Sequence, residues 1–280
     1  TSHALAIAKD AKITPDAHAA AVFCETGGGL MQQGSRFAVI VVGDELLSGK
    51  RKDKHLPHLI DVLAERGLQL AGCHIVGDDM DALVMQLLHS RQYNMPVVCF
   101  GGIGATPDDN TRASAAKAFN LALTRHPEAA NLIEQQFGAE AYPKRILMAD
   151  LPEGSILIPN PYNNIPGFSI NQHYFLPGFP QMAWPMLDWL LETYYGDVCG
   201  AKVLERSLRI YQVRESDLIE LMELLKSHYP AAKIFSLPHL GASPSIELGF
   251  RGPAAEVDQA YIDLCHRLDG RGDTYEHIGQ

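Results

Sequence analysis

The chain has 280 residues, of which 46% are hydrophobic, and its 33 acidic and 23 basic residues give a formal net charge of -10 at pH 7. This composition is that of an ordinary water-soluble protein with room for one large and one small domain. The acidity disfavours a general binder of nucleic acid or anionic membranes, and no apolar run reaches the length of a membrane span. Because the five cysteines form no CxxC pair and no secretory signal is visible, we expect reduced thiols and a cytoplasmic location.

Residues 1–34 stand apart from the rest of the sequence. They combine an alanine-rich stretch with Gly27-Gly28-Gly29, and we assign them as an N-terminal extension without chemistry. Residues 35–195 follow as a main domain, and a change in composition near residue 200 marks the start of a small domain over residues 200–280.

The main domain alternates between predicted strands and helices. A continuous apolar run over 36–42 is typical of a strand buried on both faces. A helix beginning near Asp53, a strand over 69–76, a helix over 80–91 and a strand over 96–100 follow. This βαβ alternation predicts a three-layer α/β/α domain with a mostly parallel sheet. In such open sheets, ligands bind at the carboxyl ends of the strands.

One glycine-rich loop leaves the predicted sheet at that edge. Gly101-Gly102-Ile103-Gly104 follows the strand over 96–100 and leads through Asp108-Asp109 into an alanine-rich helix. Glycines let backbone N–H groups approach an anion closely. We expect one aspartate to cap the helix, which frees the other to hold a metal ion or a polar ligand. A plain glycine turn with an aspartate cap is the alternative that this loop alone leaves open.

A second loop, over 43–54, follows the strand over 36–42. Its glycines and lysine do not form a Walker A motif, because the spacing is too long and Arg51 follows Lys50. The basic residues before the helix near Asp53 oppose its dipole, and a bound phosphate would remove that conflict. A solvated charged rim is an equally good interpretation. We expect the loops over 43–49 and 101–111 to lie side by side at one sheet edge.

The remaining sequence contains no common hydrolase motif. There is no HExxH, nothing completes a zinc site around His55 and His58, and no G-x-S-x-G is present. The proline-rich residues 151–180 predict turns and a strand over 168–175, followed by a helix over 181–195.

The elements expected after residue 200 form a small α+β domain with an antiparallel sheet. We predict strands over 203–212, 233–237 and 245–251 and helices over 215–227 and 254–268. The order is KH-like, but no GXXG clamp joins two helices, so we expect no RNA binding.

Several motifs together carry a family resemblance. Gly43-Asp44-Glu45-Leu46-Leu47-Ser48-Gly49 and the segment from Gly101 to Thr111 resemble the signature loops of the molybdopterin-binding MoaB/Mog superfamily. Within it, the chain is most similar to the amino-terminal part of competence-damage-inducible CinA proteins. Asn160-Pro161, Pro166-Gly167 and Leu176-Pro177-Gly178 follow in the order found there, and the small domain resembles their KH-like module. Since the likeness covers about residues 35–270 and the chain stops before an NMN deamidase domain, we expect no such activity.

The resemblance implies a site for a nucleotide or a pterin. CinA amino-terminal regions are associated with metal-dependent ADP-ribose pyrophosphatase activity, and Mog-type relatives adenylylate molybdopterin. By position, Glu45 and Asp109 become candidate ligands of Mg²⁺ or another divalent metal ion, and Asp108 joins them as a helper in catalysis. The further candidate contacts to a phosphate or pterin are Gly43, Asp44, Ser48, Lys50, Asp53, Gly101, Gly102, Gly104, Thr106, Thr111, Asn160 and Gly178.

Three functions stay open at this point: a hydrolase of an ADP-ribose-like dinucleotide, an enzyme that adenylylates molybdopterin, and a binding module without turnover. The chain has Asp53-Lys54-His55 where relatives usually carry Asp-Thr-Asn, and Gln181 where they often carry Glu. We also expect a homodimer, because aromatic residues are enriched at subunit interfaces. The residues that suggest it are Trp184, Trp189, Tyr194 and Tyr195.

Overall fold

The computed structural model describes residues 36–198, 203–240 and 244–278, so the N-terminal extension expected over residues 1–34 lies outside the described residues. Contacts between Cα atoms divide the chain into two compact units. One consists mainly of residues before Gly200, and the other mainly of residues after it.

The first unit is built around a six-stranded sheet with the strand order β2-β1-β3-β8-β7-β6. β1 pairs in parallel with both β2 and β3, and β3 pairs in parallel with β8. Of these six strands, β7 alone runs opposite to the other five, so the prediction of a mostly parallel sheet is confirmed. The strands are β1 (Arg36–Val42), β2 (Gln69–Val76), β3 (Val97–Phe100), β6 (Ile156–Ile158), β7 (Gly167–Ile170) and β8 (His173–Leu176).

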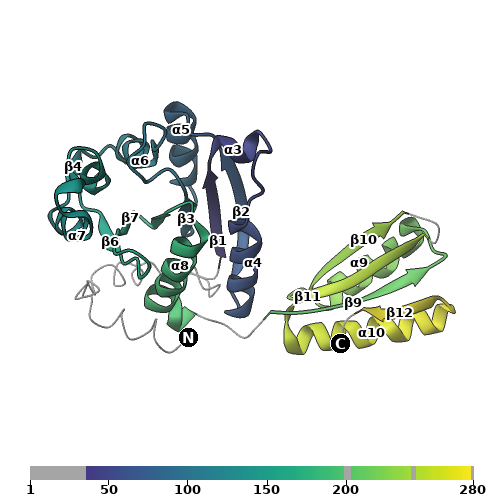
Figure 1. Ribbon diagram of the computed structural model, residues 1–280. Helices are drawn as coiled ribbons and strands as arrows, with labels where there is room; N and C mark the ends of the chain where they lie inside the picture. Colours follow the sequence, from purple (N-terminus) through teal and green to yellow (C-terminus); the bar gives the residue numbers. More distant parts are fainter. Residues whose placement is uncertain (1–35, 199–202, 241–243, 279–280) are drawn as a thin grey trace. The chain divides into compact units, whose positions relative to one another are not determined.

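Helices cover both faces of this sheet (Figure 1). Ala38, Ile40 and Val42 of β1 share a core with α5 (Met80–Ser90) and α6 (Thr111–Phe119). The alternate residues of β1 share a second core with α4 (His55–Glu65) and α8 (Pro180–Tyr195). Because successive side chains of a strand point to opposite faces, a strand covered on both sides has to be apolar throughout. The three-layer prediction is therefore confirmed.

The segment between α6 and β6 contains an insertion for which the sequence predicts no element. We use "the insertion" for residues 123–152. Its first strand pairs antiparallel with its last, and Ala129 and Ile133 of its helix enter the same core as α5 and α6. The insertion is therefore an integral part of the domain. It consists of β4 (Leu123–Arg125), α7 (Pro127–Phe137), the 3-10 turns η1 (Gly138–Ala141) and η2 (Arg145–Ala149), and β5 (Asp150–Pro152).

The single strand predicted over 168–175 is wrong, because the chain reverses within it. β7 and β8 form a hairpin whose two turn residues, Asn171 and Gln172, have φ angles of 46° and 61°. Positive φ at both central residues is typical of the tight hairpin turn whose twist matches that of the strands. The apolar residues on both sides of this turn concealed it in the sequence. The reversal is what makes β8 parallel to β3.

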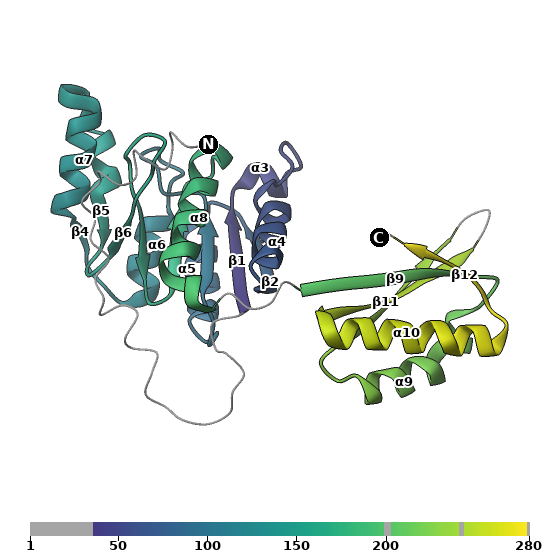
Figure 2. The same ribbon diagram turned by 90° about the horizontal axis from the view of Figure 1, so that it is seen from below.

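The second unit is a four-stranded antiparallel sheet in the order β10-β11-β9-β12, as the sequence predicts in outline. Both of its helices share one core and lie on the same face of the sheet (Figure 2). The last strand was not predicted. No helix in the described ranges is both long and apolar enough to cross a membrane. The elements are β9 (Val203–Tyr211), η4 (Glu215–Leu218), α9 (Ile219–His228), β10 (Lys233–His239), β11 (Ser245–Pro253), α10 (Ala254–Arg271) and β12 (Thr274–Ile278).

The aromatic side chains of α8 that suggested an interface find partners within the chain. The Trp184 ring stacks on His58 at a centroid distance of 4.0 Å, and Trp189 lies edge-on to Tyr194 at 5.8 Å. The hydroxyl groups of Tyr195 and Tyr174 lie 2.7 Å apart in the core. These contacts account for the aromatic residues without a second subunit, and the homodimer stays a prediction.

Candidate functional site

The carboxyl ends of β1, β2, β3 and β8 meet at one edge of the sheet, and the loops that leave them are bonded to one another. The Gly43 N–H donates to the carbonyl oxygen of Val76 at 3.0 Å, and the Gly101 N–H donates to that of Leu176 at 2.9 Å. The Asn110 amide nitrogen donates to the Asp78 carbonyl at 2.8 Å. The prediction that the loops over 43–49 and 101–111 share one edge is confirmed.

The two glycines that follow β3 pack too closely against their surroundings for any side chain. Gly101 has φ +102°, and a Cβ atom there would lie 2.6 Å from the Val42 carbonyl oxygen. Gly102 has φ +70°, and its Cβ would lie 2.2 Å from the Thr111 hydroxyl oxygen. That hydroxyl donates to the Gly101 carbonyl at 2.9 Å and is buried. The buried Thr111 side chain thus stabilises the conformation of the glycine loop.

Asp109 braces the same loop. Its Oδ2 atom accepts hydrogen bonds from the Thr106 N–H at 2.8 Å and the Thr106 hydroxyl at 2.5 Å. It also lies so close to Gly104 that a Cβ atom there would approach it to 2.5 Å. Asp108 is exposed, and the Thr106 hydroxyl lowers the pKa of its carboxyl group. The expectation that one of these aspartates caps α6 is wrong, because Asn110 occupies the N-cap position without a capping side-chain bond.

Carboxylates from three loops gather at this edge. Asp44 and Asp78 each accept a hydrogen bond from the other's backbone N–H, at 3.2 and 3.0 Å. Partial burial, followed by the negative charges of Asp44, Glu45 and Asp108, raises the pKa of Asp78. Like charges within reach of one another disfavour ionisation. Asp78 thus adds a further carboxylate to the acidic residues predicted at this edge. A bound cation or protonation of one carboxyl group would reduce the repulsion among them.

The loop before α4 contributes the basic residues. Lys50 is exposed, and Arg51 lies 3.9 Å from the carboxylate of Glu45. Asp53 caps α4, because its two carboxylate oxygens accept the N–H groups of His55 at 2.9 Å and Leu56 at 2.8 Å. Asp53 is thus engaged in the helix start. Ser48 is exposed at the end of α3 (Asp44–Leu47).

His55 connects this helix start to two other strand ends. Its ring stacks on Phe100 at 4.3 Å, and its Nε2–H donates to the Gly178 carbonyl at 3.1 Å. Burial lowers the pKa of His55, so the ring is held in its neutral form. A Cβ atom at Gly178 would lie 3.4 Å from the Cα of Gly101. The structure therefore brings Gly178 into the site, as the family resemblance implied.

Asn160 lies at the same sheet edge but farther along it. It follows β6, which is separated from β3 by β8 and β7. Its side chain is buried, and its Oδ1 accepts the Tyr162 N–H at 3.0 Å. This contact stabilises the turn after β6.

No three side chains of His, Cys, Asp or Glu are grouped as a metal site within residues 36–198, 203–240 and 244–278. Mg²⁺, however, is usually held by only one or two carboxylates together with waters and the phosphates of a substrate. Among the described residues, the carboxylates at this edge do not form a complete cage for a metal ion.

Comparison with known proteins agrees with this geometry. Residues 38–195 match the family model described as "Probable molybdopterin binding domain". The chain belongs to this molybdopterin-binding domain family. The resemblance drawn from the two loops is thereby confirmed.

Relatives of this molybdopterin-binding domain protein include a CinA-like protein of Citrifermentans bemidjiense, 31% identical over 246 residues, which are 83% of this chain and 58% of that protein. A protein of Clostridium botulinum named as competence-damage inducible is 28% identical over 66% of the chain and 47% of its own length. The chain thus spans about half the length of these relatives. The crystal structure of CinA, of unknown function, from Thermoplasma acidophilum aligns with a TM-score of 0.53 and 27% identity, covering 59% of this chain and 99% of that one.

Two site residues of the molybdopterin-binding domain were not proposed from the sequence: Asp78 and His55. A signal existed for Asp78, since Val76-Gly77-Asp78 repeats the strand, glycine and aspartate order of Val42-Gly43-Asp44. A Cβ atom at Gly77 would lie 2.4 Å from Asp44 Oδ1, which explains the glycine. His55 acts through the Gly178 carbonyl group, which is remote in sequence, so no local pattern indicates it.

Proposed function

We propose that residues 35–195 bind a phosphate-bearing small molecule, a molybdopterin or an adenine dinucleotide such as ADP-ribose, at the 101–111 loop, and that residues 200–280 form a separate KH-like module. The observation that carries this proposal is the convergence of three loops on Gly101 and Gly102, two positions that no side chain can fill. Such a loop before a helix presents backbone N–H groups to an anion. The family match supports the pterin class of ligand.

A divalent metal ion would reconcile the acidic residues with an anionic ligand. Glu45 and Asp109, together with Asp78, are the residues that would hold it, and the ion would neutralise phosphate oxygens and lower the pKa of a bound water. Without a cation, the carboxylates around Asp78 would repel a phosphate. The positive charge of the exposed Lys50 would attract an approaching anion to this edge of the sheet.

The finer proposal is that this arrangement hydrolyses the pyrophosphate bond of ADP-ribose in the presence of a divalent metal. In that reaction the loop backbone would hold one phosphate group while the carboxylates place the metal beside it. A molybdopterin adenylyltransferase and a binding module without turnover use the same cradle, and they are the alternative outcomes of the test.

The test is a screen of purified protein against ADP-ribose, FAD, NADH and ATP, with and without Mg²⁺ or Co²⁺, alongside calorimetric titration with molybdopterin. Release of AMP from ADP-ribose only when metal is present supports the hydrolase. Binding of molybdopterin without turnover of any dinucleotide supports the binding module. A protein that binds neither molybdopterin nor any of these nucleotides contradicts the proposed function.

Asp109→Ala is expected to lower metal-dependent turnover of ADP-ribose by about 100-fold or more, because loss of one electrostatic contact to the transition state commonly has that effect. The carboxylate lost is also the one that braces Thr106. Initial rates at saturating metal measure the effect. Asp81→Ala is the matched control, since Asp81 is an exposed acid that pairs with Lys117 at 3.1 Å outside the site. An Asp109→Ala protein as active as the control would remove Asp109 from the assignment.

Lys50→Ala is expected to weaken ADP-ribose binding only a few-fold and to flatten its dependence on salt, since an exposed charge acts mainly by steering. Dissociation constants at low and high ionic strength measure both effects. Lys226→Ala, which removes a lysine of α9 in the second unit, is the control. If both variants show the wild-type salt dependence, Lys50 does not contribute to attracting the ligand.

A further inference from the structure

Arg112 is a buried cation directly behind the glycine loop. It is the second residue of α6, and only 8% of its surface is exposed. An arginine side chain is almost never buried to this extent unless it has partners. Among the described residues its Nε–H has no partner, whereas Nη1 and Nη2 both donate. Where its guanidinium group donates therefore indicates what the side chain does.

The guanidinium group donates to three carbonyl groups, one in the glycine loop and two in the insertion. Nη2 donates to Gly104 of the glycine loop at 2.7 Å, and Nη1 donates to Asp150 of β5 at 3.0 Å and also to Leu147 of η2. The planar fork of arginine can reach such divergent acceptors at once, whereas a single ammonium group cannot. Arg112 therefore ties the loop to the insertion.

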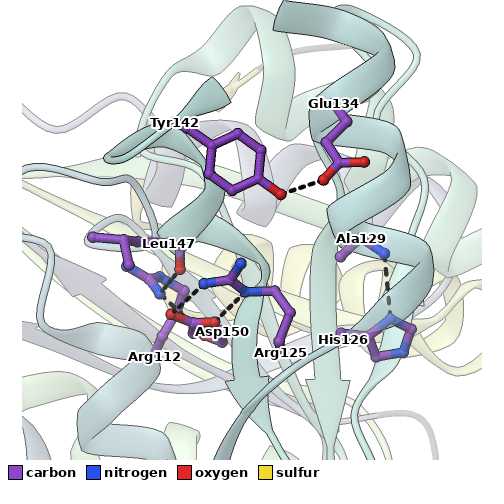
Figure 3. A network of polar contacts seen from close by, with 8 residues as sticks. All are labelled: Arg112, Arg125, His126, Ala129, Glu134, Tyr142, Leu147 and Asp150. Carbon is purple, nitrogen blue, oxygen red and sulfur yellow. Dashed lines mark hydrogen bonds and ion pairs between the residues drawn. The ribbon is translucent and has the colours of Figure 1, made fainter. Parts of the chain in front are cut away.

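The side chain of Asp150, at the insertion end of this link, has a second arginine partner. Arg125 of β4 donates to both carboxylate oxygens of Asp150, at 2.5 and 3.2 Å. Figure 3 shows the Arg125 guanidinium group beside Asp150, with Arg112 on the other side of that residue. The Tyr142 hydroxyl donates to Glu134 of α7 at 2.5 Å in the same network. Arg125 thus holds the side chain of Asp150, whereas Arg112 bonds to the main-chain carbonyl group of that residue.

The charge of Arg112 is only partly compensated. Within the described residues, no carboxylate forms an ion pair with Arg112, and its hydrogen bonds go to neutral carbonyl groups. Burial lowers its pKa, while the negative charges of Asp109 and Asp150 raise it. A guanidinium group stays protonated in proteins, so positive charge persists behind the loop. That positive charge favours the binding of an anion at the 101–111 loop.

We propose that Arg112 is a positioning residue of the ligand site, which holds the 101–111 loop against the insertion through Gly104 and strengthens its hold on a phosphate group. This inference rests on the proposed function for its ligand, because it assumes that the loop binds phosphate. On this proposal, the insertion supports the ligand site through its hydrogen bonds to Arg112.

The test compares Arg112→Lys and Arg112→Met with Arg125→Met, a control that removes an arginine on the other side of Asp150. Calorimetric titration with ADP-ribose and Mg²⁺ gives the affinity, and thermal unfolding gives the stability. We expect Arg112→Lys to bind at least about tenfold more weakly, and Arg112→Met more weakly still and with a flatter salt dependence. Arg125→Met should keep its affinity within about threefold, since Arg125 has no bond to the loop, and it should lower the melting temperature less than the Arg112 changes do, because its ion pair is partly exposed. Equal loss of affinity in all three variants would overturn the proposal.

Amide hydrogen exchange of the ligand-free proteins decides the positioning role without any ligand. Both Arg112 variants should exchange faster than wild type across residues 101–111, and Arg125→Met should not. If wild type fails to bind ADP-ribose, the proposed function is contradicted for that ligand, but the exchange result still decides the inference. Wild-type exchange of the loop in Arg112→Met would overturn it.

Discussion

Gly101→Ala is expected to destabilise the domain by about 3 kcal/mol or more and to abolish ligand binding, since strained backbone and overpacking each cost about 1–3 kcal/mol. The added Cβ atom would lie 2.6 Å from the Val42 carbonyl oxygen, which belongs to the backbone of the inner strand β1 and cannot rotate away as a side chain could. The residue would also keep φ +102°, which side chains rarely adopt. The free energy of unfolding in urea and the affinity for ADP-ribose measure the two effects.

Gly154→Ala separates the clash from the backbone strain. Gly154 has φ +80° but nothing within 4 Å of its added Cβ, so only the left-handed conformation opposes the change. That conformation costs about 1–2 kcal/mol for a residue other than glycine. We expect Gly154→Ala to lose about that much stability and to bind as wild type does. Equal losses in the two variants would show that the close approach of Gly101 to β1 is not required.

The folded protein is expected to lose up to about 3 kcal/mol of stability between pH 6.5 and pH 4 through His173 alone, at 1.36 kcal/mol for each unit of pKa difference. His173 is buried at the start of β8, where Nδ1–H donates to the Asn171 carbonyl at 2.9 Å and Nε2 lies 2.8 Å from the Ser90 hydroxyl. Burial lowers its pKa to about 4. Because the unfolded chain takes up the proton first, the stabilisation is complete above pH 6.5 and is lost as the pH falls to 4.

His173→Gln should flatten this dependence. Urea unfolding at pH 7.0, 5.5 and 4.5 measures it, and His266→Gln, which changes an exposed histidine of α10, is the control. Some dependence should remain in His173→Gln, since burial also lowers the pKa of His55. A His173→Gln protein with the pH profile of wild type would show that His173 does not titrate with folding.

The sequence predicts those parts of the fold that depend on local pattern. The apolar run over 36–42 identifies an inner strand of the sheet, and glycines at its end and at 101–104 identify the loops of the site. The Asn171-Gln172 turn was missed because its flanking residues are apolar on both sides. The insertion was missed because its two strands have only three residues each and pair across α7. Elements held by tertiary contacts of that kind leave little periodicity.

For the candidate site too, the sequence predicts what depends on local motifs and misses what depends on contacts between distant segments. Gly101, Gly102 and Gly178 lie where the loop motifs indicated. Asp53 and Thr111 lie there too, but their side chains bond to the backbone of the protein itself. A sequence pattern shows that a polar residue lies near this edge of the sheet. It does not show whether the side chain bonds to the protein's own backbone or is available to a ligand. That distinction depends on packing between segments that are far apart in the chain.

The pairing of β8 with β3 has a consequence for how the domain folds. It joins Val97 to His173 across the whole insertion, and it brings Gly178 beside Gly101. Loop closure of this length is opposed by chain entropy until the contacts form, whereas the βαβ segment from β1 to β3 closes over short distances. We therefore expect the capacity to hold a ligand to be the last property that the domain acquires. A nascent chain whose β8 residues have not yet left the ribosome already carries most of the motif residues but has no complete site.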